Sequence, residues 1–144
     1  MYKVLSITIS QMTDHVFVEN EILKMTLTES NNIVFEQLAN LTRLKLINCN
    51  VKFNYLPNLK VLKSFCSNVV GLSNLINLTE LHLASDQDFT DEDYLELSNL
   101  INLEKFMVID NYGPLRLKTV NVLKNLPNMK WLSVNSNLID IKFY

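Results

Sequence analysis

Apolar residues recur along the chain in a fixed order, two or three residues apart, and not in long uninterrupted runs. Residues 78–83 read Leu-x-x-Leu-x-Leu, and residues 103–108 keep this spacing with Leu103, Phe106 and Val108. Within "LTRLKLIN" and "MKWLSVNS", apolar residues alternate with other residues, which is typical of a short strand. The pattern therefore predicts short strands at regular intervals along the chain.

The spacing of these apolar residues repeats from one end of the chain to the other. It begins at residues 4, 22, 41, 59, 78, 103 and 129, and the heptapeptide "LSNLINL" occurs twice, at 72–78 and 97–103. A strand this short cannot bury its apolar side chains alone, so neighbouring repeats are expected to stack in parallel around one continuous core. We therefore predict a single domain, residues 1–144, with about seven repeats.

The repeated pattern resembles the consensus LxxLxLxxN/CxL of the leucine-rich repeat family. Cys49 and Asn111 occupy its Asn/Cys position, while Met12, Ser64 and the residue after Asp86 depart from it. The resemblance implies an α/β solenoid of the short, irregular intracellular type. It also implies a parallel concave sheet, helices or 3₁₀ turns on the convex side, and protein interaction as the class of function.

The return segments differ in length between repeats. The two long repeats have room for a convex helix, one with Thr90 as its N-cap and Asp93 three residues later, resembling a capping box. The other is expected to begin near Thr119, after the Gly113-Pro114 turn. The shorter repeats are expected to return through a single 3₁₀ turn or irregular backbone.

An asparagine precedes the last apolar residue of most turns, one per repeat. The amide of asparagine can donate and accept hydrogen bonds, so this column is predicted to tie the turns of adjacent repeats together, as the family resemblance also implies. Its members are Asn40, Asn58, Asn77, Asn102 and Asn128.

The third, fifth and seventh residues of each repeat are predicted to point away from the core, on the concave face. In the middle and later repeats these positions carry apolar side chains bordered by basic ones, including Lys24. The candidate protein-binding residues are Arg43, Lys45, Ile47, Val61, Lys63, Phe65, His82, Met107, Ile109 and Trp131.

An apolar centre with a charged border is the anatomy of a protein interface, and Trp and Arg are frequent binding hot spots. The sequence therefore predicts a non-enzymatic module that binds a protein partner. An alternative stays open for the seventh column, which includes Ile47, Phe65, Ala84 and Ile109. Its side chains could tilt toward the loops and be partly buried.

Candidate catalytic and metal chemistry is sparse. His82 is predicted to lie beside Glu80, Lys63 and Met107 without a nucleophile, and is interpreted as a surface histidine. The acidic run 86–93 lacks the glycine and the final glutamate of an EF-hand loop, and no nucleotide-binding or protease motif occurs. We therefore expect no enzyme activity, no cofactor and no metal site. His15 is expected in a loop, and Cys49 as a small buried thiol.

Charge and composition restrict the class of partner and the location. A net charge of −2 gives no electrostatic reason to expect nucleic acid. The first residues lack an apolar run, which predicts neither a secretory signal nor a membrane span, and two cysteines fit a reducing, cytoplasmic location. Abundant Asn and Ile with scarce Gly and Pro are typical of AT-rich coding in a parasite, an amoeba or a large DNA virus. A host protein would then fit as the partner.

The ends of the predicted stack lack a separate polar cap sequence, which terminal repeats usually need. Either the terminal strands cap themselves or an open end pairs with another copy of the chain. A self-assembling structural protein that forms homo-oligomers through its open ends is therefore the second functional hypothesis.

Overall fold

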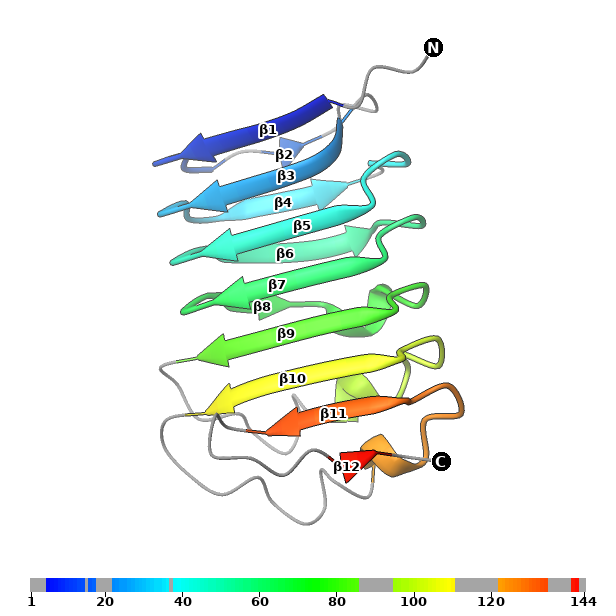
Figure 1. Ribbon diagram of the computed structural model, residues 1–144. Helices are drawn as coiled ribbons and strands as arrows, with labels where there is room; N and C mark the ends of the chain where they lie inside the picture. The colour runs from blue at the N-terminus through cyan, green and yellow to red at the C-terminus, as the bar shows by residue number, and fades with distance from the viewer. Residues whose placement is uncertain are drawn as a thin grey trace.

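A computed structural model shows a solenoid of parallel strands in which successive turns stack along one axis (Figure 1). The predicted parallel-sheet solenoid is thus confirmed. The structure describes residues 5–14, 16–17, 22–36, 38–85, 95–110, 122–134 and 141–142.

The larger sheet, called the long sheet below, has the strand order β1-β3-β5-β7-β9-β10-β11-β12. Neighbouring strands are parallel from β1 to β11, whereas β12 is antiparallel to β11. Its strands are β1 (Leu5–Ser10), β3 (Ile22–Thr28), β5 (Arg43–Ile47), β7 (Val61–Phe65), β9 (Glu80–Ser85), β10 (Lys105–Asp110), β11 (Trp131–Val134) and β12 (Ile141–Lys142).

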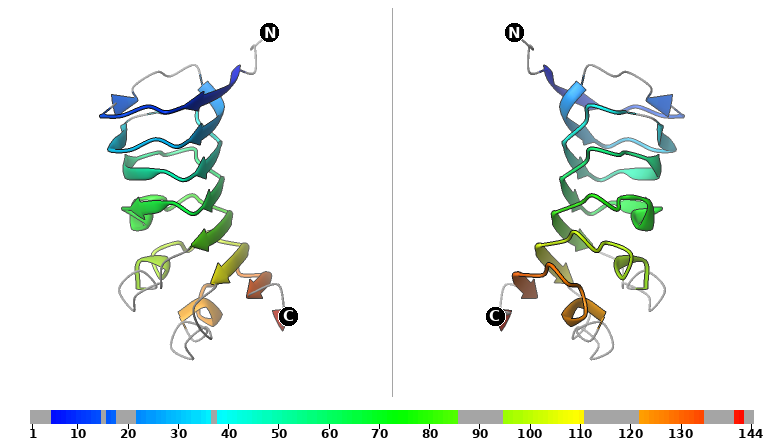
Figure 2. Two further views of the ribbon diagram at one scale, coloured as in Figure 1. Left: turned by 90° about the vertical axis from the view of Figure 1, so that its left-hand side faces the viewer. Right: turned by 90° about the vertical axis from the view of Figure 1, so that its right-hand side faces the viewer.

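A second parallel sheet lies behind the first four strands of the long sheet (Figure 1). Each of these turns therefore carries one strand in each sheet, and the two sheets face each other across the core (Figure 2). The strands of the second sheet, in spatial order, are β2 (Val16–Phe17), β4 (Ile33–Glu36), β6 (Asn50–Tyr55) and β8 (Asn68–Val70).

The second sheet corrects the prediction that the short repeats return through 3₁₀ turns or irregular backbone, which holds in the described chain only for η1 (Leu72–Asn74), after β8. In β6, Val51 and Phe53 are buried while Lys52 and Asn54 are exposed, which is the alternation of a half-buried strand. The Phe53 ring stacks on the Phe35 ring of β4, with centroids 5.7 Å apart. β-Branched and aromatic residues thus favour strands on this side of the core.

Helical backbone occurs only in short pieces of the described chain. A 3₁₀ helix, η1 (Leu72–Asn74), follows β8, and residues 95–97 and 122–124 are α-helical. The predicted helix starts at Thr90 and Thr119 lie outside the described residues, as do Asn111 and the acidic run 86–93.

The core is one continuous cluster of apolar side chains between the two sheets and the turns. Leu44 and Leu46 in β5, and Phe106 and Val108 in β10, are at most 2% exposed. Ser64, which replaces a core leucine, is also buried at 2% exposure. From β5 to β10 the positions predicted from the Leu-x-x-Leu-x-Leu spacing therefore form the core, whereas Ile7 and Ile9 of β1 are half-buried against it.

Turns from the long sheet to the second sheet use a left-handed residue. Gln11, Glu29, Asn48 and Cys66 have φ between 48° and 56°, and each donates its backbone N–H to a carbonyl at the end of the next long-sheet strand. One position further on, the Ser67 hydroxyl accepts from the backbone N–H of Cys49 (3.0 Å) and donates to the carbonyl of Phe65 (2.8 Å). The turns are thereby bonded to one another along the stack.

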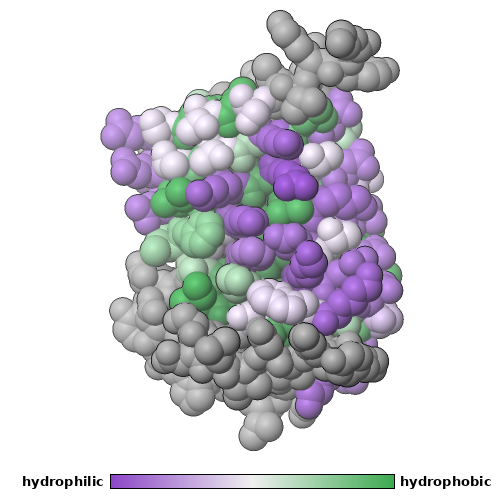
Figure 3. Space-filling view, in the orientation of Figure 1, coloured by the Kyte–Doolittle hydropathy of each residue, from purple (hydrophilic) through white to green (hydrophobic). Residues whose placement is uncertain are grey.

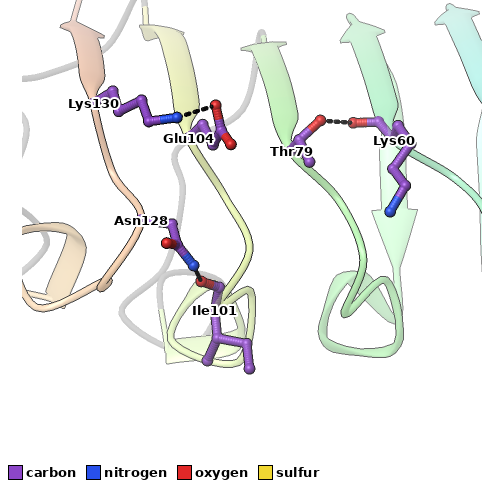
Figure 4. A network of polar contacts seen from close by, with 6 residues as sticks. All are labelled: Lys60, Thr79, Ile101, Glu104, Asn128 and Lys130. Carbon is purple, nitrogen blue, oxygen red and sulfur yellow. Dashed lines mark hydrogen bonds and ion pairs between the residues drawn. The ribbon is translucent and has the colours of Figure 1, made fainter.

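The asparagine column ties the opposite turns together, as predicted. The side-chain amides of Asn58, Asn77, Asn102 and Asn128 each donate to a backbone carbonyl of the preceding repeat, at 2.6–2.9 Å. Figure 4 shows the last of these bonds, from Asn128 to the carbonyl of Ile101.

A second ladder, which the sequence did not reveal, runs beside the asparagine column, just before the long-sheet strands. The Thr79 hydroxyl donates to the carbonyl of Lys60 at 3.1 Å, and the Lys130 ammonium pairs with the Glu104 carboxylate at 2.8 Å (Figure 4). Both sets of bonds join neighbouring repeats just before the strands of the long sheet begin.

Removing one asparagine bond is expected to cost about 1 kcal/mol of unfolding free energy. Asn102 donates to the carbonyl of Ile76, whereas Asn99 in the same heptapeptide is exposed and its side chain bonds to no described residue. Asn102→Ala should therefore shift the urea midpoint of unfolding, and Asn99→Ala should leave it close to wild type. Equal midpoints for the two variants would contradict a structural role for the column.

Candidate functional site

The strand register brings the predicted outward residues into three straight rows on the outer face of the long sheet. Residues at equivalent positions are direct neighbours from strand to strand, so Arg43 lies beside Val61, Lys45 beside Lys63, and Ile47 beside Phe65. The middle row continues through His82 to Met107. The ten predicted binding residues therefore share one face of one sheet.

The seventh-position row, called the apolar row below, is half-buried. Its described apolar members are Ile47, Phe65, Ala84 and Ile109, and all four have intermediate exposure. The open alternative of partial burial therefore holds for these four residues, Phe65 included. Val61, Met107 and Trp131 in the other rows are half-buried as well, and Asn135 lies outside the described residues.

Basic side chains crowd the early strands of the same face. Lys24, Arg43 and Lys45 are exposed, and the Lys45 ammonium lies 5.7 Å from the centroid of the Phe65 ring. This distance is within the range of a cation–π contact. In Figure 3, hydrophilic colour covers the beginnings of the middle strands and hydrophobic colour covers their arrowhead ends. Charged and apolar regions thus meet along one line.

His82 is held by a neighbouring carboxylate on its own strand. Its Nε2 lies 3.0 Å from Oε1 of Glu80, and Nζ of Lys63 lies 3.7 Å from the same oxygen. Burial lowers the pKa of His82 below its usual value, the Lys63 ammonium adds to this, and Glu80 opposes it. His82 is therefore neutral at pH 7, and its Nε2–H donates to Glu80.

The lowered pKa of His82 predicts that stability decreases in mild acid. Below about pH 6.5 the unfolded chain binds a proton at His82 before the folded chain does, so the free energy of unfolding falls as the pH falls through this range. His82→Gln should reduce that dependence. Urea unfolding of both proteins between pH 7.5 and 5.5 measures it, and parallel pH profiles would contradict the prediction.

The other candidate residues are placed away from this face or lie outside the described chain. Cys49 is a buried thiol, as predicted, and its sulfur lies within hydrogen-bonding distance of the carbonyls of Leu27 and Ile47. Cys66 is exposed at the turn after β7. His15 lies outside the described residues. Among the residues that the structure describes, no group of His, Cys, Asp or Glu could hold a metal ion.

The sequence interpretation missed the outer face of the second sheet. Val34, Lys52 and Val70 form a row across β4, β6 and β8 and line a shallow hollow of about 260 Å³. Tyr55 at the end of β6 is 56% exposed. This face has one described lysine in its row, whereas the long sheet has a cluster of cations beside apolar side chains. The long sheet is therefore the stronger candidate for binding.

Comparison with known proteins adds no family assignment. No protein-family model matches the chain, and no curated protein matches it in sequence. Within the parts of the chain that the structure describes, no helix is both long and apolar enough to span a membrane.

Proposed function

We propose that this chain is a non-enzymatic binding module that recognises a protein partner through the outer face of the long sheet. The observation that carries the proposal is the apolar row bordered by exposed cations on one face of a sheet whose strands share a regular register. Interfaces combine a poorly charged apolar centre with a polar rim, and a preformed surface loses little conformational entropy when a partner binds. Phe65 and Trp131 are the anchors, because large aromatic side chains dominate interface energetics.

We also propose that the chain is a leucine-rich repeat protein with about seven repeats. The burial of the Leu-x-x-Leu-x-Leu positions and the asparagine column supports this family, and the second sheet is an addition to its expected convex side. A reducing cytoplasmic location and a partner from a host organism fit the cysteine content and the Asn- and Ile-rich composition.

Affinity capture with matched variants tests the binding proposal. Wild-type protein and Tyr55→Asp, which places the same charge on the second sheet, should capture the same partner from a lysate of the source organism or its host. Phe65→Asp and Trp131→Asp should lose it while their circular dichroism spectra and melting stay close to wild type. Retention of the partner by both variants would overturn the proposal, and so would equal loss by Tyr55→Asp.

Self-assembly is the second candidate function, and the sheet order favours one end for it. The long sheet ends at β1 on one side, where no described strand pairs with its outer edge. At the other end, β12 pairs with Trp131 and Leu132 of β11, so the outer edge of β11 is covered at these two residues. Sedimentation of wild type and Thr8→Glu tests this role. A concentration-dependent dimer that is lost in the variant supports it, and monomers throughout exclude it.

A further inference from the structure

Charge is segregated strongly on this protein, since a chain of net charge −2 carries a cationic face. The outward positions of the long sheet hold one described carboxylate, Glu80, against five cations: Lys24, Arg43, Lys45, Lys63 and Lys105. We propose that the partner binds through an acidic, extended segment that places carboxylates beside at least one apolar side chain. This inference rests on the proposed function and specifies the chemistry of the partner.

Three of the cations lack a neutralising group in the described part of the chain. Lys24, Arg43 and Lys45 are exposed and form no ion pair with any described carboxylate. Lys24 and Arg43 are direct neighbours on adjacent strands, which lie about 4.8 Å apart. Like charges placed directly opposite each other destabilise a sheet. Such an arrangement lowers the stability of the free protein and is relieved when an anionic partner binds.

The one carboxylate among the described outward residues of this face is already engaged. Glu80 accepts from His82 at 3.0 Å and lies 3.7 Å from the ammonium of Lys63. It therefore balances the charge of Lys63 and forms no ion pair with the cations of β3 and β5. Lys24, Arg43 and Lys45 together are called the basic cluster.

The apolar row accounts for the apolar side chains of the proposed partner segment. Within β5, Lys45 and Ile47 are two residues apart, about 7 Å along the strand, and Phe65 is the neighbour of Ile47 on β7. The side chains of an extended segment point alternately to its two sides. A segment laid across β3, β5 and β7 can therefore place carboxylates over the basic cluster and apolar side chains over Ile47 and Phe65.

A protein segment fits this face better than a nucleic acid. A phosphate backbone would match the cations but would offer the apolar row no apolar side chain to contact. The Lys45 ammonium also lies 5.7 Å from the centroid of the Phe65 ring. Arg43 is the one described outward residue with a guanidinium group, the group that binds phosphate in bidentate fashion. Carboxylates next to an apolar side chain complement both halves.

Selection from a displayed library of random peptides tests the inference, with four immobilised proteins. These are wild type, Arg43→Glu/Lys45→Glu, the control Lys52→Glu/Lys124→Glu, and Phe65→Asp. The control changes the net charge by the same amount at exposed lysines away from the face. Wild type and control should enrich peptides with Asp or Glu beside apolar residues. The enriched peptide should bind the Arg43/Lys45 variant about tenfold more weakly, because exposed charge pairs contribute little each and two are reversed.

Each other outcome overturns the inference in a recognisable way. Wild type could instead enrich apolar peptides without acidic residues, and Phe65→Asp could fail to enrich them. This result would support the proposed function but contradict the inference that the partner segment is acidic. Equally weak binding of the peptide to the control would show that the effect comes from the net charge of the protein and not from the basic cluster. No enrichment on wild type, or enrichment unchanged by Phe65→Asp, would remove both proposals. A labelled single-stranded oligonucleotide that binds wild type but not the Arg43/Lys45 variant would assign the basic cluster to nucleic acid.

Discussion

Replacing Leu75 with alanine is expected to lower the free energy of unfolding by about 2–5 kcal/mol. Leu75 belongs to the first "LSNLINL" copy, is 0% exposed, and lies in the continuous core between the sheets. Truncation removes buried methyl groups and leaves a cavity that a stacked, close-packed solenoid cannot refill. For a domain whose total stability is about 5–15 kcal/mol, this is a substantial fraction of the free energy of unfolding.

The next residue in the chain supplies the matched control. Ile76 follows Leu75 directly but is 50% exposed, so Ile76→Ala should change the free energy of unfolding by about 0.5 kcal/mol or less. Leu100 and Ile101 repeat this contrast in the second copy, with 0% and 54% exposure. Urea unfolding of all four variants measures the differences. Similar losses for Leu75→Ala and Ile76→Ala would contradict the assigned orientation of the heptapeptide.

Gly71→Ala is expected to reduce the free energy of unfolding by at least about 2 kcal/mol, because two penalties add. Gly71 precedes η1 with φ 87°, a conformation that an alanine adopts only with strain. An added Cβ would also clash with the backbone carbonyl oxygen of Phe53 in β6 and come within 3.1 Å of Nδ2 of Asn74. That amide donates to the same carbonyl at 2.9 Å, so the connection between neighbouring turns would be disturbed.

A second substitution at Gly71 separates the two penalties. Asparagine tolerates the left-handed conformation better than alanine does, but it carries the same Cβ. Gly71→Asn should therefore lose less free energy of unfolding than Gly71→Ala, because the conformational penalty is smaller, but it should keep the penalty from the clash with Phe53. Urea unfolding of the two variants gives both values. A Gly71→Ala protein within about 0.5 kcal/mol of wild type would contradict the close approach of these turns.

The long sheet was predictable from β1 to β11 because each of these strands repeats one local pattern, which β12 lacks. Leu44 and Leu46 alternate with Arg43 and Lys45 inside β5, and the same apolar spacing within each strand sets the register to the neighbouring strands, although the repeats differ in length. The second sheet was missed although "NVKFNY" also alternates, since a short alternating run forms a strand only where a neighbour pairs with it. The stacking of Phe35 on Phe53 requires two return segments to lie side by side. The sequence pattern within either segment does not predict this contact.

The candidate site was predictable in its rows and not in its contacts. Parallel register alone places Ile47 beside Phe65 and Lys63 beside His82. The cation–π contact of Lys45 and the sharing of Glu80 between Lys63 and His82 depend on side-chain conformations. The half-burial of the apolar row depends on its surroundings at the strand ends. Both are set by packing between repeats, which the sequence pattern leaves open.

Methyl NMR of the protein with its captured partner tests the central claim, that the outer face of the long sheet is the binding surface. The half-buried Ile47, Met107 and Ile109 report on this face, and Val34 and Val70 report on the second sheet. Addition of the partner is predicted to shift or broaden the methyl signals of Ile47, Met107 and Ile109 and to leave those of Val34 and Val70 unchanged. Changes confined to Val34 and Val70 would contradict the claim.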